Sequence, residues 1–227
     1  MLAETGVAGC PESYFYEPTV EGWVADLGPS RAPGATGEDV LRAVRAKGRG
    51  ASSLFGLRQR APGLGFLCDG LARLYPHETT DPGRFRRAFG NLLFVHLTRA
   101  DKVAQAVSWL KAEQSGLWHV APDGAELERT APHRLPVYDA DRLAVLVEAT
   151  QAHDRIWYDW FARQGINPSS ITYDDVAADP GAILRQLLDV LGLDGRVADA
   201  VGPGVRKLAD ATSTEWAARY RADHGLT

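Results

Sequence analysis

Apolar and polar residues follow a helical period over much of the chain. Apolar side chains recur every three or four residues in several segments, and a glycine or proline stands where each pattern stops. The segments predicted to be helical are VLRAVRAKG (40–48), LGFLCDGLARLYP (64–76), DPGRFRRAFG (81–90), Asp139 to Arg163 and TEWAARYRADHG (214–225). The pair Thr36 and Asp39 has the spacing of a helix cap, so the first of these helices is expected to begin there.

Unbroken apolar runs predict strands between these helices. The clearest is LLFVHLTR (92–99), whose continuous apolar character indicates a strand covered on both faces, as in a parallel sheet. A helix is predicted directly after it, from Asp101 to about Leu117. Shorter strands are predicted at SSLFGL (52–57) and SSITYDDV (169–176), and the second precedes a helix with Pro180 in its first turn.

This alternation of strand and helix predicts a doubly wound α/β fold. The segment GAELERTAPHRLP (124–136) has no clear period and is expected to be an exposed excursion. The opening LAETGVAGCP (2–11) is typical of a helix end followed by a glycine turn. No linker or internal repeat divides the chain, so residues 1–227 are predicted to form one domain.

Composition narrows the classes of partner and site. Acidic residues outnumber basic ones by 29 to 25, which argues against nucleic acid as the main partner. The two cysteines are interpreted as reduced thiols, and the absence of an apolar run of about 20 residues or of a signal peptide predicts a cytoplasmic protein that does not span a membrane. His96, His119 and His133 lack the spacing of metal ligands, so no metal is expected. No dinucleotide-binding, Walker-type or serine-hydrolase motif is found.

The end of the strand at 92–99 is the first candidate for chemistry, because ligands of open α/β sheets bind outside the carboxyl ends of strands. Arg99 leaves this strand just before a helix, and Ser108 follows nine residues later. A guanidinium fork and a hydroxyl can together hold a phosphate. The alternative is a surface arginine paired with Asp101 and a serine that faces solvent, and spacing alone favours this alternative.

Two further segments carry candidate residues. Arg206 and Lys207 follow a glycine-rich turn and suit an anionic group, while Trp216 can either contribute to a site or belong to the core. The turn GVAGCPESYFYEP (6–18) places carboxylates beside aromatic rings, a combination that suits a sugar or another alcohol. Its polar and aromatic residues are Glu12, Ser13, Tyr14, Phe15, Tyr16 and Glu17.

Three strings resemble the Stf-type, trehalose 2-sulfotransferase-like family of bacterial sulfotransferases. They are TGVAGCPESYF (5–15), HLTRADKVAQAVSWLKAEQSGLW (96–118) and TEWAARYR (214–221). The resemblance implies a P-loop-NTPase-like sulfotransferase fold, with a parallel sheet flanked by helices and no metal. It also implies transfer of a sulfuryl group from 3′-phosphoadenosine 5′-phosphosulfate (PAPS) to a hydroxyl of a carbohydrate or related alcohol, such as a sugar or glycolipid. A homodimer is the oligomeric state that the family suggests.

The same resemblance implies roles for particular residues. Arg99 and Ser108 correspond to the pair that binds the 3′-phosphate of PAPS, with Arg206 and Lys207 as a later basic contribution. Arg58 stands where the family has a lysine and would stabilise sulfuryl oxygens. Ser13 stands where the trehalose enzyme has its glutamate, so Glu12 is the candidate base, while Ser13, Tyr14 and Phe15 are candidates for acceptor binding.

Family members begin with a strand and a loop resembling PRSGSTLL, which this chain does not contain. The expectation is therefore that the chain as given starts after the donor loop and is inactive without it. A noncatalytic binding or scaffold protein with this fold remains the alternative function. A kinase-like enzyme is a third possibility, although it needs a Walker lysine and a magnesium carboxylate that the sequence does not place.

Overall fold

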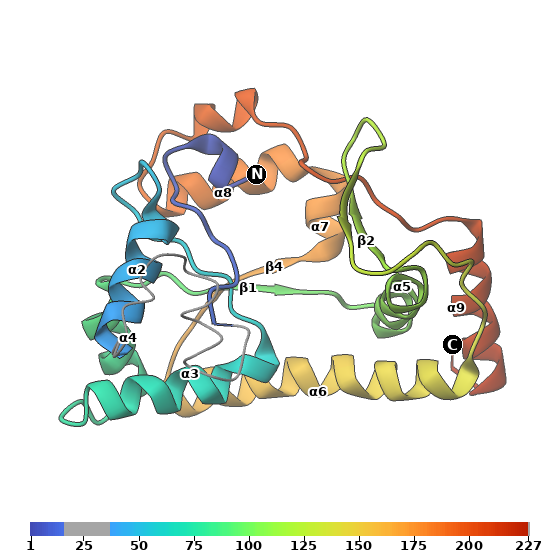
Figure 1. Cartoon of the computed structure of the whole chain (residues 1–227), viewed down its shortest axis with the longest axis horizontal. Coiled ribbons are helices and arrows are strands. Elements are labelled where there is room, and N and C mark those ends of the chain that lie inside the picture. The colour runs from blue at the N-terminus through green and yellow to red at the C-terminus, as the bar shows by residue number, and fades with distance from the viewer. Residues whose placement is uncertain (16–36, 227) are drawn as a thin grey trace. The chain divides into compact units, whose positions relative to one another are not determined.

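The structure is a computed structural model that describes residues 1–15 and 37–226 (Figure 1). Thr36, Tyr16 and Glu17 lie outside these residues, so the predicted cap at Thr36 is not tested. The elements in chain order are η1 (Ala3–Thr5), α2 (Gly37–Arg49), α3 (Ala61–Leu74), α4 (Asp81–Phe89), β1 (Val95–Thr98), α5 (Lys102–Ser115), β2 (Leu117–Val120), β3 (Glu126–Arg129), α6 (Ala140–Gln164), β4 (Ser169–Thr172), α7 (Tyr173–Ala178), α8 (Pro180–Val190), η2 (Gly195–Ala200) and α9 (Ala211–Asp223).

The described residues divide into two compact units. The first comprises Met1–His96, Trp157–Ser169 and Gly181–Val201, and the second comprises Leu97–Ile156, Ser170–Pro180 and Gly202–Thr227. Strands β1 and β4 and helices α6 and α8 contribute residues to both units. Each unit has its own cluster of buried apolar residues.

The core of the first unit is rich in aromatic rings. Phe85 and Phe89 of α4 lie 6.0 Å apart between ring centroids, and Phe85 lies 5.7 Å from Trp160 of α6. The indole Nε1 of Trp160 donates a hydrogen bond of 2.9 Å to Asp81, which satisfies the polar edge of a buried ring. Leucines of α2 and α3 complete the cluster, so the helical apolar stripes predicted from the sequence are the faces that pack here.

The core of the second unit joins α5, α9 and the N-terminal part of α6. Side-chain contacts hold the start of α9: Asp210 caps the helix through the backbone N–H of Ser213 and pairs with Lys111 of α5 at 2.6 Å. Trp216 is 6% exposed and packs in this cluster. Of the two interpretations that the sequence allowed, a site residue or a core residue, the structure supports the core residue.

Strands are shorter and more exposed than the sequence predicts. β1 and β4 form a two-stranded parallel sheet, but Val95 and Leu97 of β1 are 40% and 57% exposed while His96 between them is buried. The prediction that this strand is covered on both faces is therefore wrong: the side chains from Val95 to Leu97 alternate between an exposed and a buried direction.

The predicted strand at 52–57 is also wrong. Among contacts between described residues, Leu57 alone of this segment makes a strand-like one, an isolated parallel bridge to Glu12. The hydroxyl of Ser52 accepts from the backbone N–H of Leu54 at 3.0 Å and donates to the carbonyl of Val7 at 2.6 Å. These side-chain hydrogen bonds take the place of a strand ladder in this segment.

The segment predicted as an exposed excursion contains the second half of a hairpin. β2 and β3 pair antiparallel with register irregularities, and β3 is exposed along most of its length. Because both faces of Glu126–Arg129 meet solvent, its sequence has no apolar alternation that would reveal a strand. The structure is mixed α/β, as predicted.

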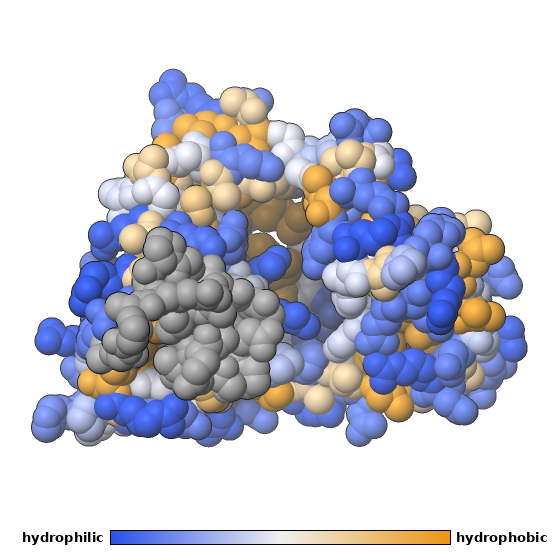
Figure 2. Space-filling view, in the orientation of Figure 1, coloured by the Kyte–Doolittle hydropathy of each residue, from blue (hydrophilic) through white to orange (hydrophobic). Residues whose placement is uncertain are grey.

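Hydrophilic residues predominate on the face drawn in Figure 2, with apolar residues scattered among them. In the described ranges, no helix has the length and apolar character needed to cross a membrane. Those ranges also contain no cluster of three or more histidine, cysteine, aspartate or glutamate side chains arranged to hold a metal ion.

Candidate functional site

In the first unit, a tight glycine turn positions the residues from Cys10 to Phe15. Gly9 has a positive φ of 73°, and a Cβ at this position would lie 2.7 Å from the carbonyl oxygen of Leu54. Only glycine fits so close an approach without strain. The backbone N–H of Cys10 donates to the carbonyl of Gly48 at 2.7 Å, which holds the turn against the end of α2.

The chain then pairs with the segment that precedes α3. Glu12 bridges Leu57, and the backbone N–H of Arg58 donates to the carbonyl of Glu12 at 3.0 Å. This pairing brings the next side chains together: the Nε of Arg58 donates a hydrogen bond of 2.9 Å to the hydroxyl of Ser13. Two residues 45 positions apart in sequence are thereby neighbours.

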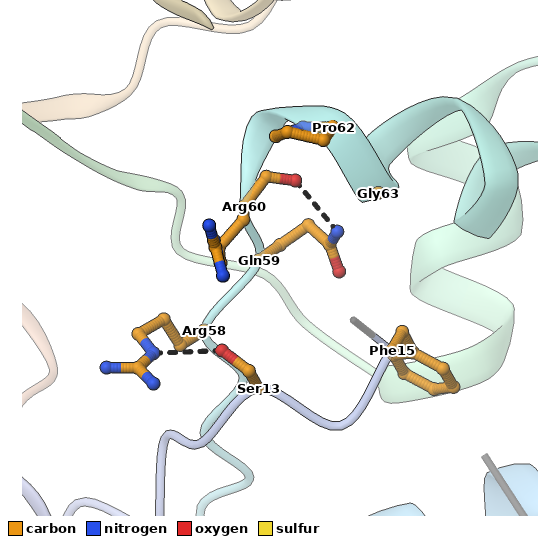
Figure 3. A pocket seen from close by; sticks show the side chains of 7 residues that line it. All are labelled: Ser13, Phe15, Arg58, Gln59, Arg60, Pro62 and Gly63. Atoms are coloured by element: carbon orange, nitrogen blue, oxygen red, sulfur yellow. Dashed lines mark hydrogen bonds between the residues drawn. The ribbon is translucent and has the colours of Figure 1, made fainter. Parts of the chain in front are cut away.

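Ser13 and Arg58 line a cavity of about 160 Å³, shown in Figure 3. The other lining residues come from the end of the glycine turn and from the start of α3: Phe15, Gln59, Arg60, Pro62 and Gly63. Hydroxyl, amide and guanidinium groups therefore share the cavity with one aromatic ring. Such a combination can bind an alcohol and an anion together.

The three candidates for acceptor binding are placed differently. Ser13 and Phe15 line the cavity, whereas Tyr14 is 4% exposed and its hydroxyl donates to the carbonyl of Cys10 at 2.7 Å. Burial, with a smaller contribution from the charge of Glu12, raises the pKa of Tyr14 to about 12. Tyr14 is therefore a neutral residue of the core in this structure. Glu12 is exposed and is not among the residues that line the cavity.

In the second unit, Arg99 follows β1 directly. Its guanidinium carbon lies 4.5 Å from the centroid of the Tyr173 ring, and Tyr173 itself follows β4 as the first residue of α7. The Nε of Arg99 is buried and has no hydrogen-bond partner among the described residues. A buried donor without an acceptor is costly in a folded protein, which makes it a candidate contact for an anion.

Asp101, the carboxylate closest in sequence to Arg99, is engaged elsewhere. Asp101 accepts from the backbone N–H of Ala104 at 2.9 Å as the N-cap of α5, and it pairs with Arg221 of α9 at 2.7 Å. Burial raises the pKa of Asp101, but the Ala104 N–H and the Arg221 guanidinium outweigh it, so the pKa is lowered overall. The sequence alternative, in which Arg99 is a surface arginine paired with Asp101, does not describe this structure.

A second polar group adjoins Arg99 in the chain. Thr98 donates to Asp154 of α6 at 2.8 Å, and the ammonium of Lys102 lies 2.5 Å from the same carboxylate. Lys102 is thus paired with a carboxylate, whereas Arg99 forms no ion pair with any residue in the described ranges. This contrast makes Arg99 the stronger candidate to bind a ligand at this strand end.

The other three residues predicted to contact the donor are exposed. Ser108 lies on the solvent side of α5, and Arg206 and Lys207 lie on the segment before α9. The backbone N–H of Arg206 donates to the carbonyl of Val120 at 2.9 Å, which fixes this segment to the end of β2. No hydrogen bond or ion pair within the described ranges joins Arg99 to any of these three side chains.

Sequence reasoning missed several residues of these sites. Tyr173 is not among the predicted site residues. It directly follows the end of β4, and ligand-binding residues are expected at the carboxyl ends of strands. Arg60 was missed as well, yet it lies two positions after Arg58, the spacing at which side chains of an extended chain share a side. Asp154 gave no signal, because a single acidic residue on a long helix is ordinary.

Comparison with known proteins shows the family. The sequence model described as Stf0 sulphotransferase matches residues 1–223. This chain belongs to the Stf0 sulphotransferase family. The chain is 31% identical over 228 residues to a trehalose 2-sulfotransferase of Mycobacterium tuberculosis (strain ATCC 35801 / TMC 107 / Erdman), covering 98% of this chain and 82% of the relative. It is 26% identical over 256 residues to a trehalose 2-sulfotransferase of Mycolicibacterium smegmatis (strain ATCC 700084 / mc(2)155), covering 98% of this chain and 88% of the relative.

Family membership confirms the resemblance drawn from the three sequence strings. It makes the chain a member of a family of sulfotransferases and shows neither the donor nor the acceptor of this particular protein. The roles of Glu12, Arg58, Arg99, Ser108, Arg206 and Lys207 stay predictions, which the geometry of each unit supports to different degrees.

Proposed function

We propose that the protein transfers a sulfuryl group from PAPS to a hydroxyl of a carbohydrate or related alcohol. Membership of the Stf0 family supports sulfuryl transfer, and the names of the two trehalose 2-sulfotransferase relatives support a sugar acceptor. The structural observation that carries the proposal is Arg99. Its buried Nε lacks a partner in the described part of the chain, and its guanidinium lies over Tyr173 at a strand end.

A phosphate group fits these residues of the second unit. A guanidinium offers several N–H donors in one plane, and its fork matches two oxygens of a phosphate. The stacked ring of Tyr173 restricts the orientation of Arg99, so less side-chain entropy is lost when a ligand binds. We assign Arg99 to the 3′-phosphate of the donor, with Ser108, Arg206 and Lys207 as additional contacts.

Residues of the first unit would act on the acceptor and on the transferring group. When bound, PAPS supplies the sulfuryl group together with a phosphate leaving group. The Nε of Arg58 bonds to Ser13, and its other two guanidinium nitrogens have no hydrogen-bond partner among the described residues. They can offset charge on the sulfuryl oxygens in the transition state. Ser13 and Phe15 would position the acceptor in the cavity.

Glu12 is the proposed general base. Its main chain is fixed by the bridge to Leu57 and by the hydrogen bond from Arg58, so its carboxylate is carried on a rigid turn beside Ser13. Glu12 would accept the proton of the acceptor hydroxyl while the hydroxyl oxygen forms its new bond to sulfur. The old bond from sulfur to phosphate breaks, and its electron pair leaves with the phosphate.

Turnover by paired variants at position 58 tests these roles. Arg58→Gln removes the charge and is expected to lower kcat by roughly 100-fold, the typical effect of losing one donor to a developing charge. Arg58→Lys keeps the charge and should retain more activity than Arg58→Gln. The matched control is Arg49→Gln, which changes an exposed arginine of the same unit that does not line the cavity. Equal rates for Arg58→Gln and the control would remove Arg58 from the mechanism.

Turnover of Glu12→Gln tests the base. The amide cannot accept the proton of the acceptor hydroxyl, so kcat should fall by roughly 100-fold or more, the typical contribution of a positioned general base. A kcat equal to that of the wild type would mean that another group accepts the proton or that no base is needed.

A further inference from the structure

The extended segment before α3 carries two guanidinium groups on one side. Arg60 has φ and ψ of −93° and 147°, an extended conformation, and it is the N-cap residue of α3. Side chains two positions apart in an extended chain point the same way. Figure 3 shows this arrangement: the guanidinium groups of Arg58 and Arg60 lie on one side of the segment, and the amide of Gln59 lies on the other.

The described residues that line the cavity beside these groups carry an excess of positive charge. None of them is a carboxylate, and neither Arg58 nor Arg60 forms an ion pair with any described residue. Within the same part of the chain, the side chain of Arg58 donates one hydrogen bond, to the neutral hydroxyl of Ser13. The amide of Gln59 binds the backbone carbonyl of Arg60 at 3.0 Å and leaves that guanidinium available.

Arg60 is a second cation at the cavity, beside the one assigned to the sulfuryl group. The proposed function places Arg58 at the sulfuryl oxygens, so the guanidinium of Arg60 is left to bind a further anion. The N-terminus of α3 adds partial positive charge at the same place, because Arg60, Pro62 and Gly63 belong to the first turn of that helix and line the cavity. A neutral acceptor would cover Arg60 without pairing it, which is unfavourable.

We propose that the acceptor carries a phosphate or carboxylate group in addition to the hydroxyl that is sulfated, and that Arg60 binds this anion. The inference rests on the proposed function and specifies its substrate class. Phe15 and Pro62 offer apolar surface for the carbon skeleton of the acceptor. Trehalose, named for the two relatives, is uncharged, so the proposed acceptor differs from it in charge.

Calorimetric titration with matched pairs of sugars tests the proposal. The pairs are trehalose with trehalose 6-phosphate and glucose with glucuronate, so that phosphate and carboxylate are examined separately. Wild-type protein should bind the charged member at least about tenfold more tightly, the effect of one hydrogen-bonded charge pair. Arg60→Gln should abolish most of this preference, and Arg60→Lys should restore part of it.

Arg86→Gln is the matched control, because Arg86 is an exposed arginine of α4 in the same unit and does not line the cavity. The preference should survive in this variant and should weaken as salt rises. Equal binding of both members of each pair, no measurable binding of the charged members, or a preference that Arg60→Gln retains would each overturn the proposal.

Transfer of label from PAPS to each sugar separates this inference from the proposed function. Sulfation of neutral and charged sugars at equal efficiency, unaffected by Arg60→Gln, would refute the anionic acceptor and leave the sulfotransferase intact. Selective binding of charged sugars without any transfer would have the opposite meaning: the anion site would stand and the proposed activity would fail.

Discussion

Replacing Arg99 with methionine should separate ligand binding from stability. Methionine keeps most of the length of the side chain and removes the guanidinium. The folded protein loses the contact with Tyr173, which is worth about 0.5 to 2 kcal/mol. It also loses a buried Nε donor that has no partner in the described residues, and such a group costs about 1 to 3 kcal/mol.

These two contributions oppose each other, so the free energy of unfolding should stay within about 1 kcal/mol of the wild type or increase. Binding of 3′-phosphoadenosine 5′-phosphate, the product form of the donor, should behave differently. Loss of a bidentate, charged contact removes roughly 3 kcal/mol, which corresponds to about a 100-fold weaker dissociation constant. A residue that serves only the fold would not show this combination.

Isothermal titration and urea unfolding measure the two effects, on the printed chain and on the longest in-frame translation of its gene. Arg142→Met is the control, because Arg142 pairs with Glu113 at 2.9 Å on the surface of the same unit. The control should change neither quantity by much, since surface pairs contribute about 0 to 1 kcal/mol. A dissociation constant for Arg99→Met within about threefold of the wild type would refute the assignment of Arg99 to the donor.

Three further predictions concern stability and reactivity. Asp210→Asn keeps an N-cap side chain but loses the ion pair with Lys111. Hydrogen bonding from Lys111 lowers the pKa of Asp210 to about 2. The ion pair should stabilise the fold by about 0.5 to 1 kcal/mol, because the carboxylate is exposed; this stabilisation is full above about pH 4 and is lost as pH falls towards 2. Urea unfolding should therefore distinguish the two proteins at pH 7 and less so near pH 2.5, and an equal difference at both would contradict the assignment. Burial raises the pKa of Cys68 to about 12, so at pH 8 its labelling by a thiol reagent, located by peptide mass analysis, should be more than about 100-fold slower in the native than in the unfolded protein; similar rates would contradict this. Leu71→Ala, at a site that is 1% exposed, should cost about 2 to 5 kcal/mol in urea unfolding, against under about 0.5 kcal/mol for Val190→Ala at a site that is 51% exposed, and equal losses would refute the described core.

Local periodicity was sufficient to predict the longer helices but not the exposed strands. The predicted strand 169–176 is wrong in its second half, because β4 ends at Thr172 and residues 173–176 belong to the short helix α7. The predicted helix from Asp139 to Arg163 corresponds to α6, because a repeating apolar stripe depends only on residues within the same segment. Strand β3 could not be predicted in this way, since Leu127 is its one apolar residue and too few apolar positions recur to reveal a strand. The exposure of Leu97 could not be predicted from the sequence either, because burial on each face of a strand depends on elements far away in sequence.

For the candidate sites as well, the sequence predicts local features but not contacts between distant residues. The strand end after β1 could be located from the sequence, and so could Arg99 as its cation. The sequence could not show that Asp101 pairs with Arg221, a residue 120 positions away, nor that Arg99 forms no ion pair with a carboxylate of the described residues. Nor could it distinguish neighbouring residues: Tyr14 turns into the core with its hydroxyl on a backbone carbonyl, while Ser13 faces Arg58.

The most direct test of the account is transfer of radioactive sulfur from labelled PAPS to a panel of neutral and anionic sugars by the purified protein. The measurement is made on the printed chain and on the longest in-frame translation of its gene, with Arg58→Gln as the inactive comparison. We expect label in a sugar product, formed by the wild-type protein and strongly reduced in the variant. Absence of label from every sugar for both forms of the protein, or equal labelling by the variant, would contradict a PAPS-dependent carbohydrate sulfotransferase and favour a noncatalytic binding protein with the same fold.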